Sequence, residues 1–216
     1  MRTTVVVAFC AACLFAGAGT PTWPAAWLWT AEMYVCALAI GFWLAKHSPR
    51  LLAQRLAPLI QACQPSWDKV FMTAVMPLFG GWLLLMGWDA GRHAAAFPLW
   101  TQILGALVFV GSFWPVHLSF RENAFAAPVV KIQPEQEVIR TGPYSLVRHP
   151  MYAGVLFFFL GAPLQLGSVY GLAAVPWLVA VLAARIVMEE RLLKAQLPGY
   201  VAYTKQVRYR LIPGVW

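Results

Sequence analysis

The sequence predicts an all-α fold, a polytopic bundle of helices that lies within a membrane. Hydrophobic residues make up 61% of the 216 residues and charged residues only 11%, whereas about 25% of a typical soluble domain is charged. The eleven Trp and seven Tyr residues suit the aromatic belts that membrane proteins place at the level of the lipid head groups. The composition therefore excludes a soluble domain and indicates an integral membrane protein.

Apolar segments of helical length follow one another along the first half of the chain. Residues 3–18 form the first; Arg2 before it and small residues at its end also suit a cleaved signal peptide, but we favour a retained membrane helix. The next expected spans are residues 25–45, 70–88 and 97–120. Between two of these spans, apolar residues recur at helical spacing and predict an interfacial helix near residues 50–62, through Leu51, Leu52, Leu56, Leu59 and Ile60.

Residues 152–188 contain two apolar stretches, separated near Gly161-Ala162-Pro163 and Gly167-Ser168, where Gly and Pro favour a turn. We therefore predict a C-terminal helical hairpin, followed by a polar, aromatic tail. The expected architecture is about four spans plus this hairpin, in one membrane domain. Its N-terminal helices occupy residues 1–125, and residues 126–216 form its C-terminal region.

Basic residues are concentrated in the connecting segments on one side. With the N-terminus in the cytoplasm, fifteen of the sixteen Lys and Arg residues lie inside and only Arg92 lies outside, as the positive-inside rule requires. This places residues 141–154 and Glu189 on the same, cytoplasmic face. We expect a protein of a bacterial inner membrane with lipids as its partners. The net charge of +8 does not indicate a nucleic-acid partner, because it follows the membrane topology.

Several single residues have ordinary structural interpretations. Cys10 and Cys13 form a C-x-x-C inside an apolar segment with no second ligand pair, so we expect helix packing and no metal. Glu32 lies inside a span and should form a hydrogen bond toward the bundle interior. His117 should be an interfacial histidine near the inner end of its span.

The most distinctive stretch is residues 141–154, Thr-Gly-Pro-Tyr-Ser-Leu-Val-Arg-His-Pro-Met-Tyr-Ala-Gly. Gly142-Pro143 favours a turn, and Arg148-His149-Pro150 puts a fixed charge, an imidazole and a helix-start proline before an apolar run. Such a helix start would offer free N–H groups and a positive dipole to an anionic or electron-rich ligand. The alternative is a turn at the membrane interface whose Arg reaches the head groups.

A second polar group lies where the hairpin ends. Arg185 and Glu189 are four residues apart and share one helix face, which an ion pair alone would explain. Both also lie near the end of a long apolar run, where a charge needs a partner or a wet cavity. Glu189 could line a pocket for a flat, polar cofactor such as a nucleoside. Five tyrosines are expected at the same cytoplasmic end and could line this pocket with it: Tyr144, Tyr152, Tyr200, Tyr203 and Tyr209.

Four motifs together resemble the isoprenylcysteine carboxyl methyltransferase family and related membrane methyltransferases acting on phospholipids and thiols. They are Gly142-Pro143-Tyr144, Arg148-His149-Pro150-x-Tyr152-x-Gly154, Glu189-Glu190, and Tyr200-x-x-Tyr203 with Arg208 before Pro213. The resemblance covers roughly residues 126–213. It implies an integral-membrane enzyme that depends on S-adenosylmethionine (SAM) and binds it in a cytoplasmic pocket.

The resemblance also implies roles for individual residues. Arg185 matches the arginine that faces and orients the substrate, and no metal is implied. The cofactor contacts would be Tyr144, His149, Pro150, Met151, Tyr152 and Glu189, together with the preceding strip that contains Gln133, Gln136, Val138 and Ile139. Arg148 is expected to be a structural anchor.

The implied reaction is methyl transfer to a lipophilic acceptor that enters from the bilayer. A carboxylate acceptor, as in isoprenylcysteine O-methylation, needs no general base, and Arg185 could orient it. A phospholipid amine or a small thiol would need deprotonation, and no dedicated base is evident, so we favour the carboxylate. Alternatives of another class are a sterol-type membrane reductase that uses NADPH and a non-enzymatic protein whose Arg–Glu pair locks the hairpin.

Overall fold

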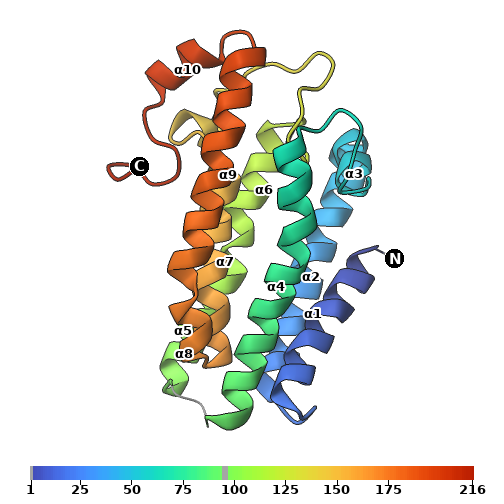
Figure 1. Ribbon diagram of the computed structural model, residues 1–216, viewed down its shortest axis with the longest axis vertical. Helices are drawn as coiled ribbons and strands as arrows, with labels where there is room; N and C mark the ends of the chain where they lie inside the picture. Colours follow the sequence, from blue (N-terminus) through green and yellow to red (C-terminus); the bar gives the residue numbers. More distant parts are fainter. Residues whose placement is uncertain (1, 94–96) are drawn as a thin grey trace.

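A computed structural model of the chain describes residues 2–93 and 97–216, and within these ranges its regular elements are all helices. The long axis of the molecule is formed by helices that run side by side (Figure 1). In chain order they are α1 (Arg2–Ala18), α2 (Pro24–His47), α4 (Ser66–Arg92), α5 (Leu99–Gly111), α6 (Phe113–Glu122), α7 (Pro150–Leu166), α8 (Val169–Ala173) and α9 (Val175–Gln196). Three short helices, α3 (Pro49–Arg55), η1 (Gly142–Ser145) and α10 (Tyr200–Gln206), lie near one end.

Four helical segments are long and apolar enough to cross a membrane: Pro24–His47, Ser66–Arg92, Leu99–Glu122 and Val169–Gln196. Helices α1 and α7 are shorter, with 17 residues each, or roughly 26 Å at 1.5 Å per residue. The predicted polytopic membrane bundle is confirmed, and so is the helical character of the first apolar segment.

The predicted hairpin is formed by α7 and α9, which run past each other in opposite directions (Figure 1). Its turn lies at Gly167-Ser168, where Gly167 adopts the left-handed conformation with φ 73° that suits a helix C-terminus. Gly161-Ala162-Pro163, the other expected break, stays helical inside α7. At the turn, the Asp89 carboxylate accepts hydrogen bonds from Ser168 Oγ at 2.8 Å and from the Tyr170 N–H at 3.0 Å, which fixes the hairpin to α4.

Two expected boundaries are wrong in the connection between α2 and α4. Helix α3 ends at Arg55 and does not continue to residue 62, because Pro58 disfavours a helical residue before it and has no N–H to donate. Helix α4 begins at Ser66, four residues before the expected start at residue 70. This earlier start brings Asp68 into the first turn of α4, with consequences for the functional site.

Small residues allow the helices to approach closely. A Cβ atom on Gly87 would lie 2.1 Å from the Leu14 carbonyl oxygen, and one on Gly105 would lie 2.3 Å from the Gln165 nitrogen. The first contact joins α1 to α4 and the second joins α5 to α7, as expected where helix packing in a membrane depends on close backbone contact. Residue types larger than glycine would push these helix pairs apart.

The main apolar core lies between these helices and contains Cys10 and Cys13, in keeping with their expected packing role; its aromatic members are Trp29, Trp82 and Phe109. Glu32 accepts a hydrogen bond from Gln165 Nε2 at 2.6 Å, which is the interior contact expected of it. His117 lies with its ring edge to Trp43, at a centroid distance of 4.9 Å.

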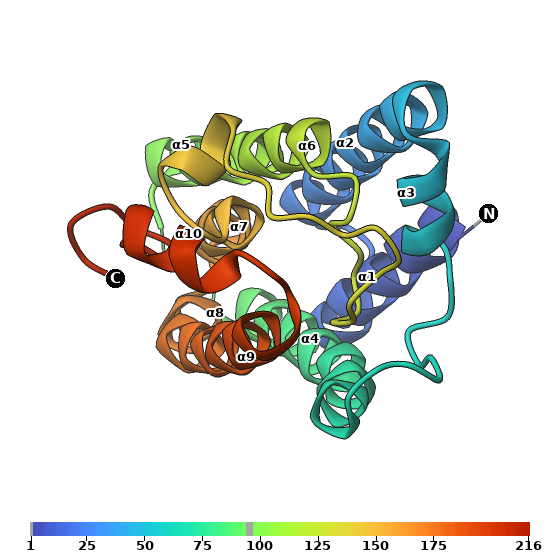
Figure 2. The same ribbon diagram turned by 90° about the horizontal axis from the view of Figure 1, so that it is seen from above.

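Seen from the end that carries α10, the irregular segment 123–141 crosses between α10 on one side and α3 at the opposite edge (Figure 2). We call these three parts the roof. The segment crosses from α6 to η1 over the ends of the helices. The opposite end of the bundle carries Arg92, at the C-terminus of α4. The last turns of α2, α3, α6 and α10, at the roof end, carry Lys46, Arg55, Arg121 and Lys205, so the roof end is the basic end.

The positive-inside rule predicts that this basic end faces the cytoplasm. Cys63 tests the prediction, because it is exposed in the connection between α3 and α4, whereas Cys10 and Cys13 are buried. A membrane-impermeant maleimide should label the protein in inside-out vesicles and not in intact spheroplasts. Cys63→Ser, as the control, should lose this labelling. Labelling of Cys63 in intact spheroplasts would reverse the orientation.

Candidate functional site

A buried ion pair organises the roof end of the bundle. Arg148, just before α7, and Glu190, near the end of α9, have side chains that are 5% and 2% exposed. Arg148 Nε lies 2.6 Å from Glu190 Oε1, and Arg148 Nη2 lies 3.3 Å from Oε2. This bidentate geometry is the strong form of an arginine–carboxylate interaction. It closes the open end of the hairpin.

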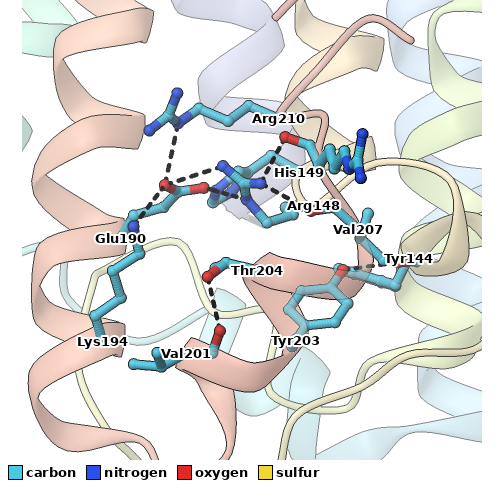
Figure 3. A network of polar contacts seen from close by, with 11 residues as sticks. Tyr144, Arg148, His149, Glu190, Lys194, Val201, Tyr203, Thr204, Val207 and Arg210 are labelled. Carbon is cyan, nitrogen blue, oxygen red and sulfur yellow. Dashed lines mark hydrogen bonds and ion pairs between the residues drawn. The ribbon is translucent and has the colours of Figure 1, made fainter.

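The same pair also holds the C-terminal tail (Figure 3). Arg148 Nη1 donates to the carbonyl oxygens of Val207 and Arg208, both at 2.8 Å. Arg210 Nε donates to Glu190 Oε2 at 3.0 Å, and His149 Nε2 lies 3.3 Å from Glu190 Oε1. Backbone N–H groups of Arg148 and His149 donate to the carbonyls of Tyr209 and Arg210. The expected role of Arg148 as a structural anchor is confirmed by these contacts.

Helix α10 is tied to the turn of the motif by a tyrosine. Tyr203 Oη donates to the Tyr144 carbonyl oxygen at 2.7 Å, and Asn123 Nδ2 donates to the Tyr144 hydroxyl at 3.1 Å. Burial raises the pKa of Tyr144 to about 12, so its hydroxyl stays protonated at neutral pH. Burial likewise raises the pKa values of Tyr200 and Tyr203. These phenols therefore remain neutral hydrogen-bonding groups.

Tyr152 joins the two residues expected to act at the end of the hairpin. Its hydroxyl donates to Glu189 Oε2 at 2.8 Å and accepts from Arg185 Nε at 3.0 Å. No ion pair within 4.0 Å joins Arg185 to Glu189, so the simple i,i+4 pair is not what the described chain forms. Glu189 and Arg185 are instead both hydrogen-bonded to the Tyr152 hydroxyl on α7.

The carboxylate that balances Arg185 comes from the other half of the chain. Asp68 on α4 is fully buried, and its Oδ1 lies 3.3 Å from Arg185 Nη2. Asp68 Oδ2 accepts from Gln64 Nε2 at 2.6 Å and from the Val130 N–H at 2.8 Å. Arg185 Nη2 also donates to the Pro128 carbonyl at 2.7 Å. These bonds fix the guanidinium between α9, α4 and segment 123–141.

A polar cavity of about 110 Å³ lies under segment 123–141. Many of the predicted site residues line it together with Tyr200 and Tyr203: Gln136, Val138, Ile139, Tyr144, His149, Met151, Tyr152, Arg185 and Glu189. The Tyr200 hydroxyl is buried and has no hydrogen-bond partner within the described residues. A buried donor of this kind normally has a partner, so it is available to a ligand.

Gln133 and Pro150 do not line this cavity. Gln133 is a buried residue that braces the roof: its Oε1 accepts from Gln54 Nε2 at 2.5 Å, and its Nε2 donates to the Phe125 carbonyl at 2.8 Å. Its N–H donates to Gln136 Oε1 at 2.9 Å. Pro150 begins α7 and places the two residues after it, Met151 and Tyr152, on the cavity wall.

A second, largely apolar cavity of about 1140 Å³ lies on the other side of Arg185, among α1, α2, α4, α7 and α9. Met151, Tyr152 and Arg185 line both cavities. The Arg185 guanidinium lies 4.3 Å above the Phe71 ring centroid, on the apolar side. The side chains of Met151, Tyr152 and Arg185 thus form a short row that separates the polar cavity from the apolar one.

Sequence reasoning missed Glu190 and Asp68. The Glu189-Glu190 pair was visible, but only the helix register shows that Glu190 faces Arg148 while Glu189 faces the cavity. The span expected at residues 70–88 leaves Asp68 in the preceding connection, whereas α4 begins at Ser66 and includes it. The sequence feature that could have identified Asp68 is an acidic residue in the first turn of a span, which is a favourable position next to the positive end of a helix.

Loss of the Glu190 charge should destabilise the fold. Glu190→Gln leaves Arg148 buried without a carboxylate, which typically costs about 3–5 kcal/mol, so the thermal unfolding midpoint in detergent should fall clearly. Glu189→Gln is the matched control, since within residues 2–93 and 97–216 the Glu189 side chain forms one hydrogen bond and no ion pair. Equal midpoints for the two variants would contradict the anchoring role of Glu190.

Comparison with known proteins agrees with this site. Residues 100–198 match the family model described as phospholipid methyltransferase, a region that runs from α5 through α9 and contains Arg148, Tyr152, Arg185 and Glu189. No curated protein matches the chain. The match supports the interpretation of this chain as a membrane methyltransferase. It also agrees with the sequence motifs, which resemble related membrane methyltransferases.

Proposed function

We propose that this protein is a SAM-dependent methyltransferase that acts on a lipophilic acceptor from the bilayer. The observation that carries the proposal is the meeting of the two cavities at Met151, Tyr152 and Arg185. A polar cofactor and a hydrophobic acceptor could approach each other across this row from opposite sides. Alignment of two reactants is the main contribution required of an enzyme for such a transfer.

The polar cavity has the chemistry that such a cofactor needs. SAM would supply an electrophilic methyl group on a positively charged sulfur. Glu189 offers a carboxylate with one hydrogen-bonded oxygen, and the Tyr200 hydroxyl has no hydrogen-bond partner among the described residues. The rings of Tyr144 and Tyr203 add aromatic faces, which attract cations. Val138 and Ile139 lie in an irregular segment whose backbone groups can bind a base.

The volume of the polar cavity sets a condition on binding. About 110 Å³ is below the ~300–1,000 Å³ typical of small-molecule sites. A nucleoside-sized ligand therefore requires segment 123–141 to move outward. This segment contains no regular helix or strand before η1, so its displacement would not break a helix.

Arg185 is suited to orient the acceptor, although several of its donors already have partners. Its Nε and Nη2 atoms already bond Tyr152 and Pro128, while Nη1 lies 3.9 Å from Met72 Sδ. With Asp68 beside Nη2, a bidentate pair with an acceptor carboxylate would compete with existing bonds. We therefore propose that Arg185 orients a lipophilic acceptor, a carboxylate included, through Nη1.

Cofactor binding by detergent-purified protein tests the proposal directly. SAM should bind saturably, and Glu189→Ala and His149→Ala should each weaken binding about tenfold or more, the loss expected for one charge-assisted hydrogen bond. Glu135→Gln, exposed and outside the cavity, is the control. Binding of NADPH in place of SAM would refute the methyltransferase proposal and favour a reductase. Since His149 contacts Glu190, the unfolding midpoint of each variant is measured alongside.

The role of Arg185 is tested by separating binding from turnover. Arg185→Ala should bind SAM as the wild type does but lose turnover by about 10²-fold, because the acceptor is no longer held in line. Arg191→Ala, exposed on the same helix and outside both cavities, should retain turnover. If Arg185→Ala loses cofactor binding instead, Arg185 belongs to the cofactor pocket or supports the fold.

A further inference from the structure

Two hydrogen bonds hold the middle of segment 123–141 to the Asp68–Arg185 pair. The Val130 N–H donates to Asp68 Oδ2 at 2.8 Å, and the Pro128 carbonyl accepts from Arg185 Nη2 at 2.7 Å. Asp68 and Arg185 lie on the long helices α4 and α9, and their side chains are 0% and 5% exposed. Both side chains are therefore fixed in the bundle, whereas the segment that they hold is irregular.

These two hydrogen bonds lie where the cavities meet. Val130 lines the polar cavity, Pro128 lines the apolar cavity, and Arg185 lines both. The polar cavity, at about 110 Å³, admits a nucleoside-sized ligand only when the segment moves outward. Outward movement of residues 128–130 breaks both bonds, because Asp68 and Arg185 stay on their helices. Entry of the cofactor therefore changes the contacts of the residue that faces the acceptor.

Loss of the Pro128 contact changes what Arg185 can bind. While the segment is in place, Nε bonds Tyr152 and Nη2 bonds Pro128, and in the described part of the chain only Nη1 has no oxygen acceptor. Without Pro128, Nη1 and Nη2 together present the two-pronged edge of a guanidinium, which matches a carboxylate. Asp68 Oδ1, 3.3 Å from Nη2, keeps the charged group from following the segment.

We propose that Asp68 is a positioning residue that couples the two cavities: it holds residues 128–130 to Arg185 while the polar cavity is empty, and entry of the cofactor frees Arg185 Nη2 for the acceptor. Each ligand then increases the affinity for the other by the same factor, as thermodynamic linkage requires. This role of Asp68 rests on the proposed function. Because Asp68 lies outside residues 100–198, which match the family model, the coupling depends on the N-terminal part of the chain.

S-adenosylhomocysteine, a cofactor analogue without the reactive methyl group, is titrated into detergent-purified protein. Val130→Pro removes the N–H that Asp68 accepts, so opening the segment breaks one hydrogen bond fewer, and the analogue should bind about tenfold more tightly than to the wild type. A purely structural role of this bond predicts weaker binding. Ile132→Pro is the matched control and should bind as the wild type does, since the Ile132 N–H has no acceptor among the described residues and Ile132 lines neither cavity.

Asp68→Asn tests the other end of the same bond. The amide still offers an oxygen to Val130 but no charge, so the analogue should bind about threefold more tightly than to the wild type. The double variant should bind no more tightly than Val130→Pro alone, because both changes act on one bond. The unfolding midpoint shows which variants fold, and either single variant decides the sign. Additive gains, or wild-type or weaker affinity in a folded single variant, would overturn the proposal.

The acceptor side is tested with dodecanoate, a carboxylate with an apolar chain. Its affinity should rise about tenfold when S-adenosylhomocysteine is present, because Arg185 then offers two donors instead of one. The rise should be absent in Arg185→Lys, whose ammonium cannot form the two-pronged contact, and should persist in Ile132→Pro. Equal dodecanoate affinity with and without the analogue in the wild type would refute the coupling while the proposed function stands. Absence of any binding of the analogue to the wild type would refute both.

Discussion

The buried pair of Arg148 and Glu190 is the interaction on which the roof end of the molecule depends. Each charge is costly to bury alone, and each is satisfied by the other with additional hydrogen bonds. Three separate segments meet there: the start of α7, the end of α9 and the tail after α10. Because Arg148 and Glu190 are fixed, their neighbours His149 and Glu189 are placed on the wall of the polar cavity.

A second polar centre connects this roof to the rest of the bundle. Tyr152, Arg185 and Asp68 form a continuous chain of contacts from α7 through α9 to α4. Asp68 lies outside residues 100–198, the region similar to the phospholipid methyltransferases. The N-terminal helices therefore do more than surround the site: they supply the carboxylate that balances its arginine and one wall of the apolar cavity.

The two cavities differ in charge as well as in polarity. The polar cavity is lined by charged residues of both signs, with Glu137 and Glu189 beside Lys131, Arg148 and Arg185, whereas the charged residues that line the apolar cavity within the described ranges are arginines. A ligand with charged groups of both signs, such as the proposed cofactor, suits the mixed lining of the polar cavity.

The sequence by itself determined the membrane bundle, the C-terminal hairpin and most of the residues around the polar cavity. These follow from local properties: apolar segments of spanning length, Gly-Ser at a turn, and charged residues at the end of an apolar run. The end of α3 at Arg55 was also accessible in principle, because Pro58 carries a local signal.

The tertiary structure alone decided which charged residues form ion pairs with each other. Glu190 instead of Glu189 pairs with Arg148, Asp68 instead of Glu189 pairs with Arg185, and Gln133 braces the roof outside the cavity. These partners are separated by 42 residues for the first pair and by 117 for the second, counted from Arg148 to Glu190 and from Asp68 to Arg185. A local pattern shows that a buried charge needs a partner. The identity of that partner depends on helix register and on long-range packing, and neither can be read from the spacing of residues within one segment.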